Sequence, residues 1–236
     1  MIDLDDVKLR VERDGFAVTA PVLSRSEVAQ LNRCIARSRG DGRGNLRDLF
    51  RRVPDTARLP RHAQIRQVVE AVLGPGPFGV RALLLDKTPI ANWNVAWHQD
   101  VTIAVKRRSD APGYGSWSIK EDVPHVQPPT PVLEAMLAVR LHLDHCGPEN
   151  GPLRLIPGSH QHGRMSPEEV DRFRASHAAV ECHVARGGLL LMRPLTLHAS
   201  SAARAPAQRR VVHLEFAAIA LDPGVEWYEQ LYTCVP

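Results

Sequence analysis

The residues best placed for chemistry lie in the segment Trp97-His98-Gln99-Asp100, inside a strand-like run from Asn94 to Val105. Residues i and i+2 of a strand point to the same face, so His98 and Asp100 are expected side by side with Gln99 turned away. An imidazole and a carboxylate placed in this way supply two ligands of a 2-His-1-carboxylate metal site, which leaves open positions for substrate and oxygen. Such a pair also occurs by chance, so a third ligand is needed to support a metal site.

His198 is the best candidate for that third ligand. It follows the apolar strand-like run Gly188–Met192 and a short turn, and it precedes the small residues Ala199 to Ala202. A hundred residues separate it from His98, so most of a β core must fold between the two. Other histidines remain open as alternatives or as parts of a second polar cluster: His142, His145, His160, His162 and His213.

The elements that would position these side chains are short strands. From residue 78 onward, strand-like runs alternate with turns rich in proline and glycine, which is typical of a sandwich or barrel rather than a parallel α/β sheet. We predict a mainly β fold of the jelly-roll, cupin-like type. The runs are Val80–Leu85, Asn94–Val105, Leu137–Leu143, Gly151–Ile156, Gly188–Met192 and Arg209–Ala217.

The first third of the chain is expected to be helical. Ser24 and Glu27 form a potential capping box before a helix, and the spacing over Ala63–Leu73 predicts a second helix that stops at Gly74. A short strand is expected at Gly15–Val18. We therefore expect one domain over residues 1–236, in which a helical third (1–77) packs on a β core (78–236).

Composition is typical of a globular protein. The chain has 236 residues, of which 44% are hydrophobic and 24% charged, and no apolar run approaches the ~20 residues of a membrane span. The N-terminus does not resemble a secretory or transit signal, and the four cysteines, Cys34, Cys146, Cys182 and Cys234, lack CxxC spacing. These features predict free thiols and a cytoplasmic location, with no membrane partner.

The net charge is +4, and 26 of the 30 basic residues are arginine. Arginine suits anionic ligands, although genome composition alone can produce such an excess. The arginine-rich stretch from Arg33 to Arg66 could in principle bind nucleic acid. It has few aromatic residues and no base-reading motif, so a solvated helical face is the preferred interpretation and no nucleic-acid partner is expected.

Several ordered motifs together give the chain a family resemblance. Gly15-Phe16 is followed by Trp97-His98-Gln99-Asp100, Leu143-Asp144, Glu149-Asn150-Gly151-Pro152-Leu153, Ile156-Pro157-Gly158-Ser159-His160-Gln161-His162-Gly163, Gly187-Gly188-Leu189-Leu190-Leu191 leading to His198, and Arg209-Arg210. In this order they resemble the phytanoyl-CoA dioxygenase family of iron(II)- and 2-oxoglutarate-dependent oxygenases. The resemblance covers nearly the whole chain and is strongest to bacterial members that carry Val123-Pro124-His125-Val126-Gln127-Pro128-Pro129.

This resemblance implies a double-stranded β-helix and assigns iron(II) to His98, Asp100 and His198. It implies that Arg209, eleven residues after His198, binds the distal carboxylate of 2-oxoglutarate, and that the Ser200 hydroxyl helps to hold it. With O2 the expected reaction hydroxylates a C–H bond of a small-molecule substrate and releases succinate and CO2. Halogenating relatives lack the carboxylate at the position of Asp100, so its presence argues against halogenation.

Five further residues are candidates. Arg140 and Lys87 could contact the cosubstrate, since a cation within an apolar strand is costly unless it meets an anion. Trp117, in a Gly-rich segment expected to be a loop, could line the substrate mouth with His125 and Gln127. Arg210 should point away from Arg209, toward solvent or a surface partner.

Two other functions remain open at this point. The same three ligands could serve a non-catalytic metal-binding sensor or scaffold. They could also hold the metal of a zinc hydrolase or of a cupin-type oxygenase that does not use 2-oxoglutarate. A basic residue at position 209 argues against the hydrolase, which has no need of a guanidinium there.

Overall fold

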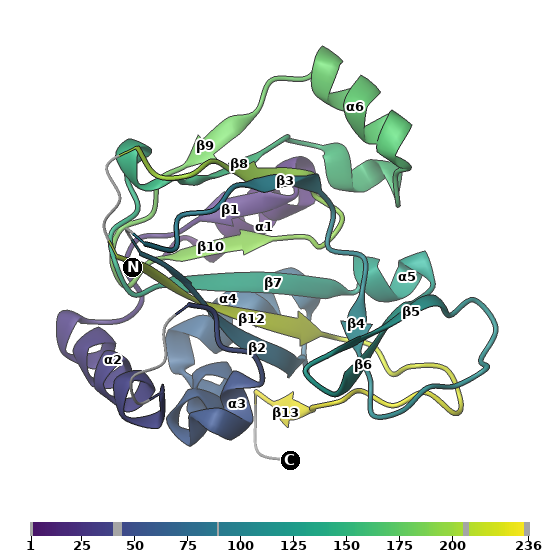
Figure 1. Cartoon of the computed structure of the whole chain (residues 1–236), viewed down its shortest axis with the longest axis horizontal. Coiled ribbons are helices and arrows are strands. Elements are labelled where there is room, and N and C mark those ends of the chain that lie inside the picture. The colour runs from purple at the N-terminus through teal and green to yellow at the C-terminus, as the bar shows by residue number, and fades with distance from the viewer. Residues whose placement is uncertain (1, 40–43, 89, 205–207, 234–236) are drawn as a thin grey trace.

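A six-stranded antiparallel sheet forms the centre of the protein in the computed structural model, which describes residues 2–39, 44–88, 90–204 and 208–233 (Figure 1). Its neighbouring strands are far apart in sequence, so chain segments from both ends meet within it. The strand order is β1 (Phe16–Val18), β10 (Leu189–Met192), β7 (Met136–His142), β12 (Arg209–Ala217), β2 (Phe78–Lys87) and β13 (Leu231–Tyr232).

A second antiparallel sheet lies over the first in Figure 1, and a third forms beside them. The second has the order β3 (Val95–His98), β11 (His198–Ser200), β8 (Leu153–Leu155) and β9 (Val180–Cys182). The third joins β4 (Ile103–Ala104), β6 (Val123–Gln127) and β5 (Gly115–Lys120). Facing antiparallel sheets with these long connections form the jelly roll that the sequence predicted.

Helices of the N-terminal third cover the side of the six-stranded sheet that lies away from β3, β8 and β11, whereas helices of the β region lie elsewhere around the sheets (Figure 1). Those of the N-terminal third are α1 (Leu4–Asp14), α2 (Arg25–Arg39), α3 (Leu49–Arg52), the 3-10 helix η1 (Pro54–Arg61) and α4 (Ala63–Leu73). Those within the β region are α5 (Thr130–Glu134), η2 (Pro148–Asn150), η3 (Ser159–His162) and α6 (Pro167–Ser176). No helix in the described ranges is long and apolar enough to cross a membrane.

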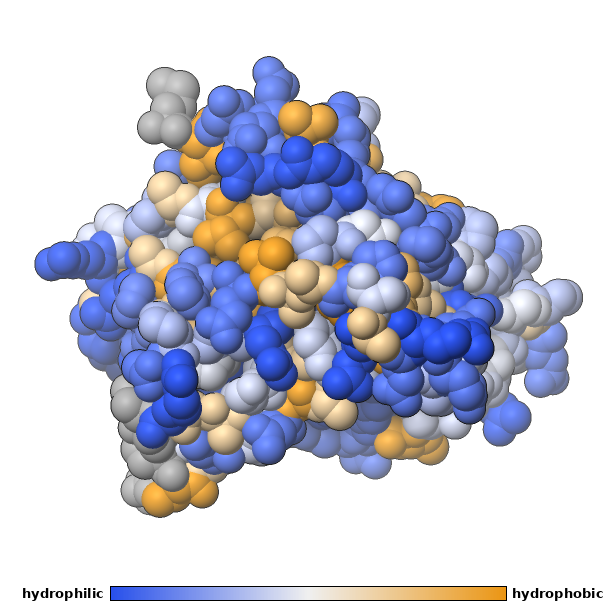
Figure 2. All heavy atoms as spheres, turned by 90° about the horizontal axis from the view of Figure 1, so that it is seen from above, coloured by the Kyte–Doolittle hydropathy of each residue, from blue (hydrophilic) through white to orange (hydrophobic). Residues whose placement is uncertain are grey.

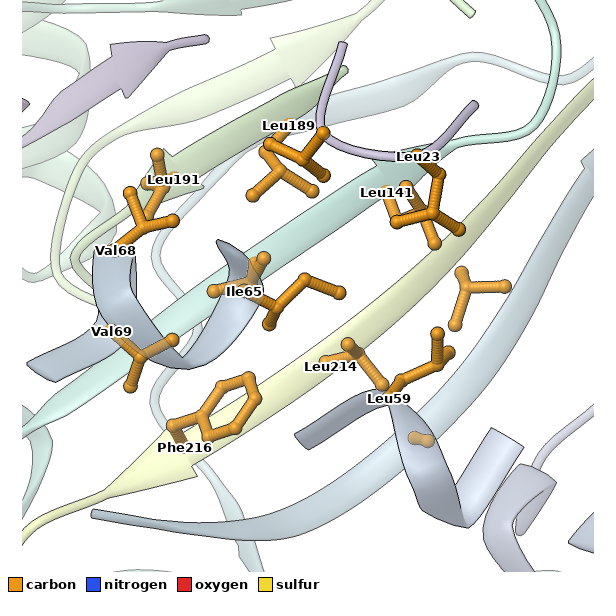
Figure 3. Close-up of a cluster of buried hydrophobic side chains, with 14 of the residues drawn as sticks. Leu23, Leu59, Ile65, Val68, Val69, Leu141, Leu189, Leu191, Leu214 and Phe216 are labelled. Atoms are coloured by element: carbon orange, nitrogen blue, oxygen red, sulfur yellow. The ribbon is translucent and has the colours of Figure 1, made fainter. Parts of the chain in front are cut away.

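The main hydrophobic core lies between these helices and the sheet. On α4, Ile65, Val68, Val69 and Val72 follow helical spacing and are all buried. They meet apolar strand residues such as Phe216 of β12, as Figure 3 shows. One cluster therefore joins the helical third to the β core. The outer surface is different: the face seen in Figure 2 is mostly hydrophilic, with apolar residues confined to small areas.

Side chains on β12 alternate between the two faces of the sheet, and this alternation separates the core residues from the site residues. Val212, Leu214 and Phe216 belong to the core on the helix side, so His213 and Arg209 must point the other way, toward the space between the sheets. Both residues do line a cavity there. The helices thus stabilise the sheet from behind and leave its inner face to polar residues.

Two segments differ from the sequence-based expectations, and a third was given no expectation of its own. The run Asn94–Val105 is not one strand: β3 ends at His98 and β4 begins at Ile103, while the backbone N–H of Asp100 donates to the carbonyl of Pro194. The segment around Trp117 is not a loop but the strand β5. Residues 4–14 form α1, whose N-cap Asp3 accepts a hydrogen bond from the Asp6 backbone.

Other local predictions are confirmed. The reciprocal hydrogen bonds between Ser24 and Glu27 start α2 as a capping box, and α4 covers the predicted Ala63–Leu73. Cys34, Cys146 and Cys182 are free thiols, whereas Cys234 lies outside the described residues.

Candidate metal and cosubstrate site

Strand register brings His98 and His198 together. The two residues are direct partners in the antiparallel pairing of β3 with β11. Their ring centroids are 4.1 Å apart, so the imidazoles face each other despite their separation in sequence. The pairing of these two strands therefore brings together two of the three potential metal ligands.

Asp100 completes a cluster of three potential ligands. One carboxylate oxygen lies 3.7 Å from Nε2 of His98, and the other lies 3.7 Å from Nε2 of His198. These distances are too long for hydrogen bonds. One ligand atom from each residue falls within 4.8 Å of the others, which is a spacing that can surround a metal ion.

Both imidazoles are held in the tautomer that metal binding requires. Nδ1 of His98 lies 2.8 Å from the carbonyl oxygen of Ala96, and Nδ1 of His198 lies 2.9 Å from that of Thr196. Because a carbonyl can only accept, each Nδ1 carries the proton and each Nε2 keeps its lone pair. The backbone thus fixes both ring orientations before any metal binds.

The charge states also suit a cation. Burial lowers the pKa of His198 to about 4, so its ring is neutral at pH 7. Burial by itself would raise the pKa of Asp100, but the nearby His198, His213 and His98 outweigh it and lower that pKa to about 2. The site therefore presents the neutral imidazole of His198 and the negative charge of Asp100 to a cation.

Gln99 is turned away from this cluster, as predicted. Its amide donates to the carbonyls of Gly163 and Leu195 at 2.8 Å, and its oxygen accepts from the Met165 backbone N–H at 2.8 Å. These bonds fix the segment in which His98 and Asp100 lie, although that segment leaves the regular strand after His98.

A pair of buried cations lies at one end of the same space. Lys87 of β2 and Arg209 of β12 are directly opposite each other. The Lys87 ammonium donates to Ser200 Oγ at 3.1 Å and to the carbonyl of Ser201 at 3.0 Å. Burial, followed by the charge of Arg209, lowers the pKa of Lys87 to about 8.

Arg209 has unused hydrogen-bonding capacity. Its Nη1 donates to the carbonyl of Gly151, but its buried Nε has no partner among the described residues. A buried N–H without an acceptor is costly. Lys87 is a cation and cannot provide that acceptor, so this end of the cavity is built for an anion.

Arg140, which also lines the cavity, begins a row of polar side chains in contact with one another. Its Nη1 lies 3.2 Å from Nδ1 of His213, its cross-strand partner, and Nε2 of His213 lies 3.2 Å from Oε1 of Glu215. Burial and then the charge of Arg209 lower the pKa of Arg140 to about 10. Its Nε also lacks a partner within the described part of the chain.

All of these groups except Glu215 line one cavity of about 380 Å³. Asp100 is the one acidic residue in its described lining, against six lysines and arginines. The basic residues are Arg47, Arg81, Lys87, Lys120, Arg140 and Arg209. Arg47, Arg81 and Lys120 were not predicted, although Arg81 shares the inner face of β2 with Lys87 because the two are an even number of residues apart.

The structure does not bring the three predicted substrate contacts together. His125 lines a smaller adjoining cavity. Trp117 packs against a separate apolar cluster and lies under Arg108, and Gln127 accepts a hydrogen bond from Arg164. Neither Trp117 nor Gln127 lines either cavity.

The remaining basic and histidine candidates lie elsewhere. Arg210 points away from Arg209, as predicted, and forms a two-pronged ion pair with Asp144. His142 is buried on β7, and His160 and His162 lie on η3, so none of these three belongs to the triad. His213 alone among the alternative histidines lines the cavity.

Solved structures with the same fold include three informative cases. The non-heme alpha-ketoglutarate-dependent carbocyclase SnoK from nogalamycin biosynthesis has a TM-score of 0.74 and 15% identity, covering 96% of this chain and 94% of that chain. AviO1 from Streptomyces viridochromogenes Tue57 has a TM-score of 0.68 and 24% identity, and the match covers 94% of this chain and 98% of that chain. EctD from S. alaskensis, crystallised with 2-oxoglutarate and 5-hydroxyectoine, has a TM-score of 0.71 and 21% identity. The match covers 91% of this chain and 77% of that chain.

The fold and the facing His, Asp and His residues define a jelly-roll oxygenase. Residues 11–211 match the family described as phytanoyl-CoA dioxygenase, and the chain belongs to that family. As a member, it is an Fe(II)- and 2-oxoglutarate-dependent oxygenase. No curated protein sequence matches the chain.

Proposed function

We propose that this oxygenase hydroxylates a C–H bond of a small molecule, with iron(II) held by His98, Asp100 and His198 and 2-oxoglutarate held by Arg209. The observation that carries the proposal is the set of three ligand atoms within 4.8 Å of one another, in a cavity that also contains buried, uncompensated cations.

The donor set fits iron(II). Two imidazole nitrogens and one carboxylate oxygen converge from β3, the segment after it, and β11, which is the ligand combination of non-haem iron oxygenases. Iron in such a site, with its cosubstrate and O2, supplies the oxidising power for C–H hydroxylation and releases succinate and CO2. The chain supplies the ligands and holds both substrates in place.

The basic end of the cavity fits a dicarboxylate. The Nε–H of Arg209 is free to donate to a carboxylate, and its Nη1 is anchored by Gly151, so the guanidinium is already oriented. Lys87 can transfer one of its hydrogen bonds from Ser200 to the same carboxylate, which would raise the pKa of its ammonium group again. Arg140 is placed to contribute at longer range. A zinc hydrolase would have no use for this cluster.

Similar folds support a small-molecule substrate but allow several outcomes. The EctD structure contains 5-hydroxyectoine, whereas SnoK is described as a carbocyclase and SnoN as an epimerase. Hydroxylation is the simplest outcome of the shared chemistry. The free thiols of Cys34, Cys146 and Cys182 further support a reducing, cytoplasmic setting.

The decisive experiment measures succinate formed from 2-oxoglutarate by the purified protein. We expect slow turnover without substrate that requires both iron(II) and O2 and stops when zinc replaces iron. A protein that binds iron but forms no succinate under any condition would be a metal-binding scaffold. Substrate cleavage that persists with zinc and without 2-oxoglutarate would identify a hydrolase.

A further inference from the structure

A second group of cations lies at the opposite end of the cavity from Arg209. Arg47, Arg81 and Lys120 line the main cavity and also a smaller one of about 50 Å³, so the two spaces adjoin there. Arg47 precedes α3, Arg81 lies on β2 and Lys120 ends β5. Three elements far apart in the chain therefore direct positive charge to one place.

These cations are incompletely neutralised. Lys120 has a long hydrogen bond, 3.4 Å, to Thr102 Oγ1, and its pKa is lowered by burial and then by Arg81 and Arg47.

The acidic neighbours of the other two cations are distant or shared. Arg47 lies 3.8 Å from the half-exposed Glu121, which also pairs with Arg52. Arg81 lies 3.5 Å from Glu215, which His213 also contacts. Asp48 and Glu229 also line the smaller cavity, so its described lining has three acidic residues against four lysines and arginines. The remaining excess of positive charge is one that an anion would relieve.

The cosubstrate cannot account for this second group. Arg81 and Lys87 lie on the same face of β2 six residues apart, a separation of about 20 Å at the rise of a strand. A short C5 dicarboxylate held by Arg209, opposite Lys87, spans only a fraction of that length. The groups around Arg81 and around Arg209 must therefore serve two different anions.

His125 adds a second requirement, a hydrogen-bond donor on the ligand. It is 97% buried, lines the smaller cavity and lies on the same face of the β5–β6 hairpin as Lys120. Its Nδ1 lies 3.0 Å from the carbonyl of Val123 and must carry the ring proton, and burial lowers its pKa to about 4. Nε2 is then an acceptor, and it has no partner among the described residues.

We propose that the substrate is a small anion whose carboxylate or phosphate group binds Arg47, Arg81 and Lys120, and which donates a hydrogen bond to His125 from a hydroxyl or amine. The part of this proposal that concerns turnover rests on the proposed oxygenase function. The part that concerns binding does not, because it can be measured without any reaction.

The test is calorimetric titration of inorganic phosphate into the protein loaded with iron(II) and saturating 2-oxoglutarate, without O2. Lys120→Gln and Arg47→Gln should each weaken phosphate binding about tenfold, because each removes a charge-assisted hydrogen bond. The matched controls are Lys106→Gln and Arg107→Gln, two exposed residues paired with Glu226, which should leave phosphate binding unchanged. Circular dichroism of each variant verifies its fold.

Two further titrations define the anion. Acetate in place of phosphate shows which class is preferred: tighter phosphate binding supports a phosphate ester and tighter acetate binding supports a carboxylate. Sulfate lacks the proton of hydrogen phosphate, so His125 should favour phosphate over sulfate. His125→Leu should abolish that preference, and His125→Gln, which retains an acceptor, should restore part of it.

Several results would overturn the proposal. One is that neither phosphate nor acetate binds, and another is that both bind equally well to Lys120→Gln, Arg47→Gln and the wild type. A third is phosphate binding that disappears once 2-oxoglutarate is saturating, which would place it at Arg209. Failure to form succinate with intact, Lys120-dependent phosphate binding would refute the oxygenase assignment and leave the anion site standing.

Discussion

Lys87 and Arg209 occupy opposed positions on β2 and β12, so two cations share one buried end of the cavity without an acid between them. Burial, and then the charge of Arg209, lowers the pKa of Lys87, and Nε of Arg209 has no partner among the described residues. A pair of like charges in this position is destabilising unless a doubly negative ligand joins them. This relationship makes cosubstrate binding the most direct property to test.

Arg209→Ala should raise the apparent KM for 2-oxoglutarate by roughly ten- to a hundredfold, because it removes charge-assisted hydrogen bonds from a buried carboxylate. Steady-state succinate formation over a range of 2-oxoglutarate concentrations measures the effect. The matched control is Arg210→Ala, which loses the ion pair with Asp144 and should cost about 1 kcal/mol of stability with little change in KM. An unchanged KM in Arg209→Ala would mean that another residue holds the carboxylate.

The affinity for 2-oxoglutarate should fall as pH rises through about 8, the pKa of Lys87 in the free protein. The protonated amine binds the dianion and the neutral amine does not, so binding takes up a proton above that pH. KM measured between about pH 7 and about pH 9 should therefore rise in the wild type. Lys87→Met should have a higher KM that no longer changes over this range; a parallel rise in both proteins would assign the titration to another group.

Asp100→Ala should remove iron binding and 2-oxoglutarate turnover while the fold remains intact, because it deletes the one negative ligand of the triad. His98→Ala should behave in the same way. Metal content after anaerobic loading, together with circular dichroism, gives the measurement, and the exposed Asp110→Ala is the control. Wild-type iron binding and turnover in both triad variants would refute the metal site.

Phe216→Ala should destabilise the protein by about 3–5 kcal/mol, because the ring is fully buried between β12 and the helices and its loss leaves a cavity. Urea denaturation followed by circular dichroism measures this change. Ile119→Ala, at a residue that is 75% exposed, should change stability by less than about 0.5 kcal/mol. Equal effects at the two positions would show that the helix–sheet core is not the main source of stability.

The sequence alone predicted the features that depend on a single helix or strand. The α4 boundaries follow from apolar spacing and a glycine stop, and the pairing of His98 with Asp100 follows from local geometry even though the strand ends at His98. Arg209 and Arg210 separate to opposite sides because they are neighbours on a strand.

Features that depend on several elements could not be predicted in this way. The β5–β6 hairpin turns through Glu121 and Asp122, both with positive φ and neither a glycine, so its sequence resembles a loop. The group of Arg47, Arg81 and Lys120 depends on that hairpin packing beside β2 and the segment before α3. Trp117 was wrongly assigned to a loop because Gly113 and Gly115 precede it, whereas α1 could have been found from its Asp3 cap and Gly15 stop.

The β5–β6 hairpin packs through an apolar cluster that includes Val126 and Trp227 together with Phe78 and Val80 of β2 and Met136 of β7. This cluster is distinct from the core between the helices and the six-stranded sheet. Lys120 and His125, which line the two cavities, are thus carried by a hairpin that does not pack against the helix-side core. Exchanging this hairpin for one of another sequence offers a route to new selectivity with the catalytic apparatus left untouched. Laboratory evolution of this enzyme should accordingly concentrate its accepted changes there rather than in β7 or β12.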